Sequence, residues 1–196
     1  MKVKEVLMLA AENLGRQDLS DALAREGEEE GEEQTEEQLD GYPDEIKSLV
    51  RCFNLVESEV ALDYFPLKKE ETFVPMGRIV PYTQFSSSPV DVLKVTDERG
   101  GGVEFEVRTA HLYLPEARGK VNITYSYAPA PKTLLDDSEF SGKVSPRLMS
   151  FGVAAEFCLS ASRFSEAAVW ERRFLDALKA AKLIRRKLSM RARRWV

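Results

Sequence analysis

The sequence predicts an α+β protein in which four main helices form a bundle and a small antiparallel β lobe is inserted between the second and third helices. In both terminal parts, apolar residues recur every three or four positions, which indicates amphipathic helices. Within residues 103–127 apolar and polar residues alternate, which is typical of strands. With 196 residues, 43% of them hydrophobic, the chain is long enough to bury a core.

We therefore expect three regions along the chain. Residues 1–66 hold the N-terminal helices, with an acidic loop at 26–40. Residues 67–130 form the inserted β lobe. Residues 131–196 contain a linker, a C-terminal helical pair and a basic tail.

Two helices are expected in the N-terminal region. The first covers residues 3–14 and ends at Gly15, with residues 18–24 adding a turn or two. The second runs from about Pro43, which suits a first helical turn, to Phe65, and Pro66 stops it. Its apolar stripe is continuous and consists of Ile46, Leu49, Val50, Phe53, Val56, Val60 and Tyr64.

The β lobe is predicted from alternation in residues 103–107 and 121–127. Val103, Phe105 and Val107 are expected to share one sheet face. A glycine-rich hairpin turn at residues 97–102 and a second turn at 115–120 separate the strands. Weaker strands are expected near residues 72–74 and 77–80, and one face of the sheet is expected to be buried.

After a polar linker, a third helix is expected to begin at Ser145, a favourable N-cap that Pro146 follows in the first turn. Its apolar stripe is Leu148, Phe151, Ala155, Cys158 and Leu159. The chain breaks near Ser162. A fourth helix then carries Ala167, Trp170, Phe174, Leu178, Ala181, Ile184 and Leu188.

Charge is distributed very unevenly around a formal net charge of −5. Residues 26–40 contain nine acidic and no basic residues, and residues 177–196 contain eight basic and no acidic residues. This asymmetry suggests two surfaces with different partners. A simpler alternative is a solvated, mobile acidic loop together with a basic helix end that complements the helix dipole.

No catalytic, cofactor-binding or metal-binding pattern is found in the sequence, so we expect a protein that is not an enzyme. The lone histidine, His111, falls within an expected strand, and Cys52 and Cys158 lack metal-type spacing. We interpret both cysteines as reduced thiols in or near the core. The apolar stretch at residues 6–11 is too short for a signal peptide, and no run suits a membrane span.

The basic tail is the strongest candidate for a binding site. Arginine and tryptophan are enriched in the hot spots of protein interfaces, and dipole compensation needs only one or two cations. The same residue types can bind phosphates, but the rest of the chain is acidic, which favours a protein partner. The candidate partner-binding residues are Arg185, Arg186, Arg191, Arg193, Arg194 and Trp195.

Four stretches resemble head–tail connector (adaptor) proteins encoded by prophages of Gram-positive bacteria. They are NLVESEVALDYFPL at residues 54–67, SPRLMSFGVAAEFCL at 145–159, AAVW at 167–170 and RARRWV at 191–196. The resemblance implies a homo-oligomeric ring, of twelve subunits by analogy, that binds the portal protein and a downstream tail or stopper protein. DNA would pass through its channel non-specifically.

The resemblance also implies that the tail docks on the portal. The protein would be made in the bacterial cytoplasm and located at the virion head–tail junction, without membrane contact. Two alternatives remain open: a nucleic-acid-binding or regulatory module that uses the basic tail, and another tail component, such as a stopper or tail terminator.

Overall fold

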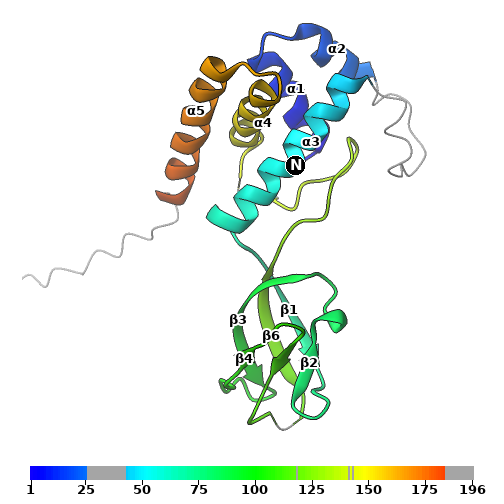
Figure 1. Ribbon diagram of the computed structural model, residues 1–196, viewed down its shortest axis with the longest axis vertical. Coiled ribbons are helices and arrows are strands. Elements are labelled where there is room, and N and C mark those ends of the chain that lie inside the picture. The colour runs from blue at the N-terminus through cyan, green and yellow to red at the C-terminus, as the bar shows by residue number, and fades with distance from the viewer. Residues whose placement is uncertain (26–42, 118, 141, 143, 184–196) are drawn as a thin grey trace, which may run out of the picture. The chain divides into compact units, whose positions relative to one another are not determined.

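The computed structural model describes residues 1–25, 43–117, 119–140, 142 and 144–183. The chain divides into two compact units, which we call the helical unit (Met1–Glu57 and Pro131–Val196) and the β unit (Ser58–Ala130). Figure 1 shows helices in the first and strands in the second. The predicted α+β class is confirmed.

The described part of the helical unit contains five α-helices rather than four. They are α1 (Val3–Asn13), α2 (Gln17–Arg25), α3 (Asp44–Glu59), α4 (Pro146–Ser160) and α5 (Phe164–Leu183). The additional helix is α2, which the sequence suggested only as a turn or two. Gly15, with a φ of +69°, lets the chain turn sharply between α1 and α2. The narrower expectation of a four-helix bundle is not confirmed.

The second expected helix changes its hydrogen-bonding pattern near its end. After α3 the chain continues as a π-helical turn, Val60–Tyr64, and leaves helical geometry at Phe65, whose φ is −134°. The ring of Pro66 disfavours helical geometry at the preceding residue, which explains why the helix ends here.

Helix α4 packs against α1 and α5 (Figure 1). It begins as predicted: the Ser145 hydroxyl accepts a hydrogen bond of 3.1 Å from the Leu148 amide, and Pro146 lies in the first turn. Gly152 lies on α4 where side chains of α3 and α5 contact it. A Cβ at Gly152 would lie 2.6 Å from Cγ1 of Val56 and 3.0 Å from Cε2 of Phe174. The absence of a side chain at Gly152 therefore permits this three-helix contact.

The β unit contains two three-stranded antiparallel sheets around one core. The first has the order β1 (Leu67–Phe73), β6 (Val121–Tyr127), β3 (Pro89–Asp97), and the second has the order β2 (Ile79–Pro81), β5 (His111–Tyr113), β4 (Glu106–Val107). The core residues are Phe73, Val80, Phe85, Val92, Val95, Leu112, Leu114, Val121, Ile123 and Tyr125.

The expected strand at residues 103–107 is mostly wrong, because only Glu106 and Val107 are in a strand. The chain after the hairpin turn pairs with β3 only as far as Val103, whose amide donates to the Val95 carbonyl. Strand β4 then pairs with β5. Val103 and Phe105 pack against the core, but Val107 is 62% exposed. Residues 103–105 therefore connect the two sheets, and the alternation there reflects partial burial, not one continuous strand.

The hairpin turn at residues 97–102 is confirmed. The Asp97 carboxylate accepts hydrogen bonds from the amides of Arg99 and Gly101, and Gly100 supplies a φ of +82°.

Strand β1 is longer than the predicted strand near residues 72–74. Its residues 68–71 are all charged, which suits an edge strand but conceals it from a search for apolar alternation.

We predict that Gly152→Ala lowers the free energy of unfolding by about 1–2 kcal/mol, because the new methyl group overlaps Val56, whose branched side chain cannot easily move aside. Helix propensity alone would give the opposite sign, a gain of up to about 1 kcal/mol. Urea denaturation distinguishes destabilisation by the overlap from stabilisation by helix propensity. Ala168→Gly at an exposed position of α5 measures the propensity effect alone, and a stabilised Gly152→Ala protein would contradict the close packing.

Candidate functional site

Four side chains of α4 and α5 form a stacked row, which we call the Arg–aromatic stack. The guanidinium of Arg147 lies over the Phe151 ring, 5.6 Å from its centroid. The rings of Phe151 and Trp170 stack with a centroid distance of 5.9 Å and an interplanar angle of 24°. The guanidinium of Arg173 then lies 4.7 Å from the Trp170 centroid. Helical spacing places these residues together, four positions apart in α4 and three in α5.

The two arginines of this stack have no carboxylate partner among the described residues. Other basic residues in or next to α5 do have one, since Arg163 pairs with Glu166, and Lys179 lies 3.7 Å from Asp176. Stacking on an aromatic face leaves the in-plane N–H donors of a guanidinium available for a carboxylate or phosphate. The stack therefore presents two positive charges on an aromatic base.

A groove next to the stack provides apolar surface. Its volume is about 830 Å³, and Arg147 and Phe151 belong to both the groove and the stack. The other lining residues are Met1, Gly142, Val144, Ser145, Pro146, Leu148, Ala177, Ala180 and Ala181. The small alanines of α5 would let a partner backbone approach closely. We call the groove and the stack together the docking surface.

Helix α5 packs on α4 through one line of buried residues and leaves other apolar side chains exposed. Its fully buried positions are Ala167, Phe174 and Leu178, which lie on one line along the helix. Phe164 and Val169 remain 67% and 54% exposed. Such uncovered apolar residues beside an arginine and a tryptophan are typical of a surface that binds another protein.

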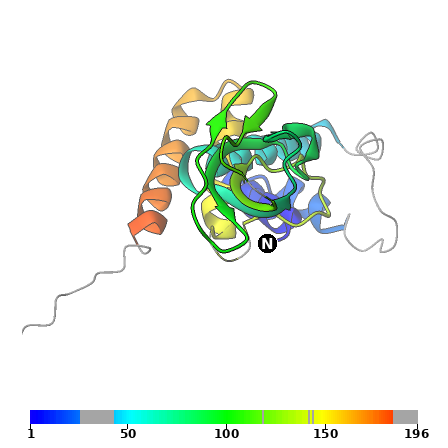
Figure 2. The ribbon, with the colours of Figure 1, turned by 90° about the horizontal axis from the view of Figure 1, so that it is seen from below.

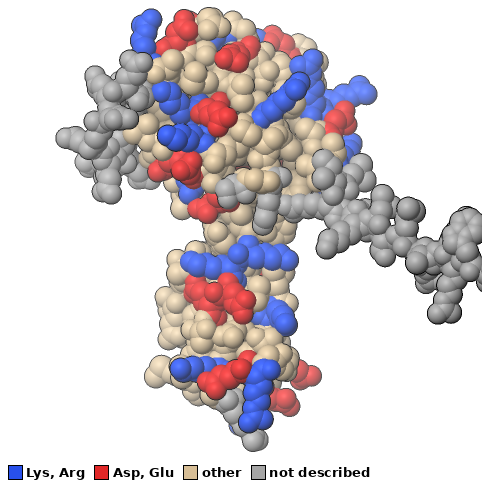
Figure 3. Space-filling view, turned by 180° about the vertical axis from the view of Figure 1, so that it is seen from behind, with Lys and Arg blue, Asp and Glu red and all other residues tan. Residues whose placement is uncertain are grey.

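The charge on the described surface is mixed in sign. On the face in Figure 3, acidic and basic side chains lie interspersed over both units. Non-specific nucleic-acid binding normally needs a clearly basic patch or stripe. The docking surface combines two cations with apolar and aromatic surface.

The predicted partner-binding residues Arg185, Arg186, Arg191, Arg193, Arg194 and Trp195 lie outside the described residues, as does the acidic loop at 26–40. Sequence reasoning missed the docking surface. It assigned Phe151 and Trp170 to core-facing stripes, but both are only partly buried. The available signal was the arginine at one helical turn from each aromatic residue.

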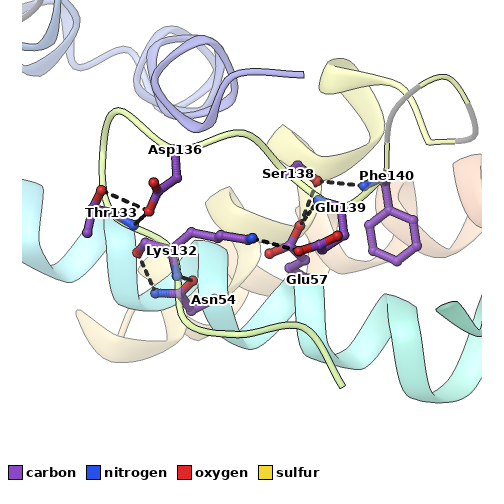
Figure 4. Close-up of polar contacts among 8 residues, drawn as sticks. All are labelled: Asn54, Glu57, Lys132, Thr133, Asp136, Ser138, Glu139 and Phe140. Atoms are coloured by element: carbon purple, nitrogen blue, oxygen red, sulfur yellow. Dashed lines mark hydrogen bonds and ion pairs between the residues drawn. The ribbon is translucent and has the colours of Figure 1, made fainter. Parts of the chain in front are cut away.

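A second group of polar residues holds the chain where it returns from the β unit (Figure 4). The side-chain amide of Asn54 donates to the Lys132 carbonyl at 3.0 Å and accepts from the Lys132 amide at 2.7 Å. Oε1 of Glu57 accepts from the Ser138 hydroxyl at 2.6 Å and from the Glu139 amide at 3.0 Å. We call this group the linker anchor, because it fixes residues 132–139 on α3.

The linker anchor holds a glutamate, a serine and a lysine, which are residue types used in catalysis. Their contacts are structural, however: Lys132 pairs with Glu139 at 2.8 Å, and Glu57 is only 1% exposed. A substrate could not reach Glu57 without displacing the linker. The group therefore acts as a support.

The other reactive side chains also have structural positions. Cys52 and Cys158 are buried and free, and burial raises the pKa of the Cys52 thiol to about 11, which makes it a poor nucleophile at neutral pH. His111 is half-buried in β5. Within the described ranges, no group of acidic, histidine and cysteine residues could hold a metal ion, and no helix is long and apolar enough to cross a membrane.

No protein-family model and no curated protein matches this chain.

We predict that Glu57→Gln stabilises the helical unit increasingly as pH rises. Burial, which outweighs the hydrogen bonds from Ser138 and Glu139, raises the pKa of the Glu57 carboxyl. The protonated carboxyl adds to the free energy of unfolding. This contribution is complete below the ordinary glutamate pKa and is lost as pH rises through the raised pKa of the folded state. Glutamine can keep the Oε1 acceptor without the buried charge. Thermal melts from pH 4 to 8 should converge at the acid end, and a constant difference would contradict the raised pKa.

Proposed function

We propose that this chain is a head–tail connector (adaptor) of a phage or prophage, which assembles as a ring on the portal and joins the head to the tail. The observation that carries the proposal is the docking surface. It combines stacked aromatic rings, an apolar groove and two arginines that have no carboxylate partner among the described residues. These are features of a surface that another protein covers.

Two further observations support a structural role. The linker anchor and the buried thiols place the reactive side chains of the described residues in supporting positions. The long helices α1, α3, α4 and α5 are suited to form the wall of a ring as a bundle. The basic segment after α5 would then contact the portal, and the ring would leave a channel for DNA.

The decisive test is assembly with the portal. Size-exclusion chromatography with light scattering should show a ring-sized complex when the candidate portal protein is present, whatever the state of the chain alone. A chain that stays monomeric with the portal would refute the proposal. The alternative, a nucleic-acid-binding module, would instead appear as DNA binding that persists at physiological salt.

We predict that Trp170→Ala weakens assembly on the portal by about 2 kcal/mol, as is usual for a tryptophan in an interface hot spot. The substitution removes the ring on which both Phe151 and Arg173 stack. The matched control is Leu55→Ala, which truncates an exposed apolar side chain of α3 outside both the stack and the groove. Equal losses of affinity for the two variants would contradict a specific role for the stack, and circular dichroism verifies that both remain helical.

We predict that deletion of residues 191–196 abolishes portal binding and leaves the helical content unchanged. The segment joins three arginines to Trp195, whose large ring would anchor a protein contact. Trp195→Ala should then cost more affinity than Arg193→Ala. If the segment binds DNA instead, the arginines should matter more than the tryptophan and the affinity should fall steeply with salt.

A further inference from the structure

The docking surface restricts the chemistry of whatever covers it. Arg147 and Arg173 present guanidinium groups that lack a carboxylate partner among the described residues, and the groove beside them is mainly apolar. Positive charges next to an interface are best matched by carboxylates. The occupant should therefore be rich in carboxylates and also carry a few apolar side chains.

One segment of the chain has this composition. Residues 26–40 contain nine acidic residues and no basic ones, and Leu39 and Tyr42 follow the glutamates as apolar residues. The segment after α5 also contains apolar residues, but it is strongly basic, so the two arginines of the docking surface would repel it. Charge therefore favours the acidic segment over the basic one.

The arrangement of the helices indicates which copy supplies the segment. In Figures 1 and 2, α5 lies on one flank of the helical unit, whereas the end of α2 and the start of α3, from which the acidic segment departs, lie on the opposite flank. Helix α4 packs between α1 and α5. The acidic segment thus starts away from the docking surface of its own copy, on the side that would face a neighbour.

We infer that residues 26–42 of one copy, which contain the acidic segment, bind the docking surface of the next copy. Such a contact joins two different surfaces, so it repeats from copy to copy and closes into a ring when the rotation between copies permits. The inference rests on the proposed ring assembly and adds to it the identity of the subunit contact. It also gives the acidic segment a partner.

The direct test uses a fluorescent peptide of residues 26–42 and the full-length chain. Fluorescence anisotropy at low salt should show saturable binding, which should disappear at about 1 M salt, where charges are screened beyond about 3 Å. Arg147→Gln/Arg173→Gln should weaken binding about tenfold, since two charge pairs are lost. Arg51→Gln, which removes an exposed charge from α3, is the matched control and should have no effect. Absence of saturable binding, or equal binding to both variants, would overturn the inference.

A charge exchange tests the contact between whole chains. One variant carries Glu28→Lys, Glu29→Lys and Glu30→Lys, and the other carries Arg147→Glu and Arg173→Glu. Each alone opposes like charges and should self-associate more weakly than the unmodified chain in sedimentation velocity. Mixed together, they pair opposite charges at both kinds of contact, so association should return. A mixture that associates no better than its components would overturn the inference.

Portal assembly of the same variants separates the two ideas. If the peptide fails to bind while the unmodified chain still assembles on the portal, the inferred subunit contact is wrong and the connector function stands. If the peptide binds and the charge exchange restores association while portal assembly fails, the contact stands as a self-association site and the connector function is wrong.

Discussion

The hydrogen bonds between Asn54 and Lys132 determine where the chain re-enters the helical unit after the β unit. The side-chain amide of Asn54 matches both the carbonyl and the amide of Lys132, so it substitutes for a neighbouring backbone strand. One helical turn later, Glu57 accepts two further hydrogen bonds from the same linker. Because α4 and α5 follow this linker directly, their placement on α3 depends on these contacts.

The linker also joins the N-terminus to the docking surface. The Met1 amine lies 3.6 Å from the Asp137 carboxylate, and the Ser138 amide donates to the Met1 carbonyl. Met1 in turn lines the groove together with Val144 and Leu148, which follow the linker. The groove is thus built from parts far apart in the sequence, and its shape depends on the linker anchor and on the close approach at Gly152. Burying Glu57 carries a desolvation cost, which the hydrogen bonds it accepts partly offset.

Elements with strong local signals could be predicted from the sequence, and those that depend on partners distant in the chain could not. Strand β6 was predicted because apolar and polar residues alternate along it, and the structure buries Val121, Ile123 and Tyr125. Helix α4 was predicted from its start at Ser145 and Pro146. Strand β1 was missed in large part because an edge strand tolerates charges. The stack was missed because a helical stripe does not reveal whether another helix or solvent covers it: Phe174 is buried, whereas Trp170 is only partly covered.

The side chains that α5 leaves exposed connect the stability of the helical unit to the binding of a partner. Ala167, Phe174 and Leu178 are the buried residues of α5, and the Arg–aromatic stack adds to its packing on α4. A partner that binds the folded helical unit at this surface stabilises it by mass action. Arginines without carboxylate partners would remain in water when the surface is open and would gain charge-assisted hydrogen bonds when it is covered. A surface of this kind favours association without requiring chemistry, because the free energy gained on covering it comes from apolar contact and from pairing charges that the described fold leaves unpaired.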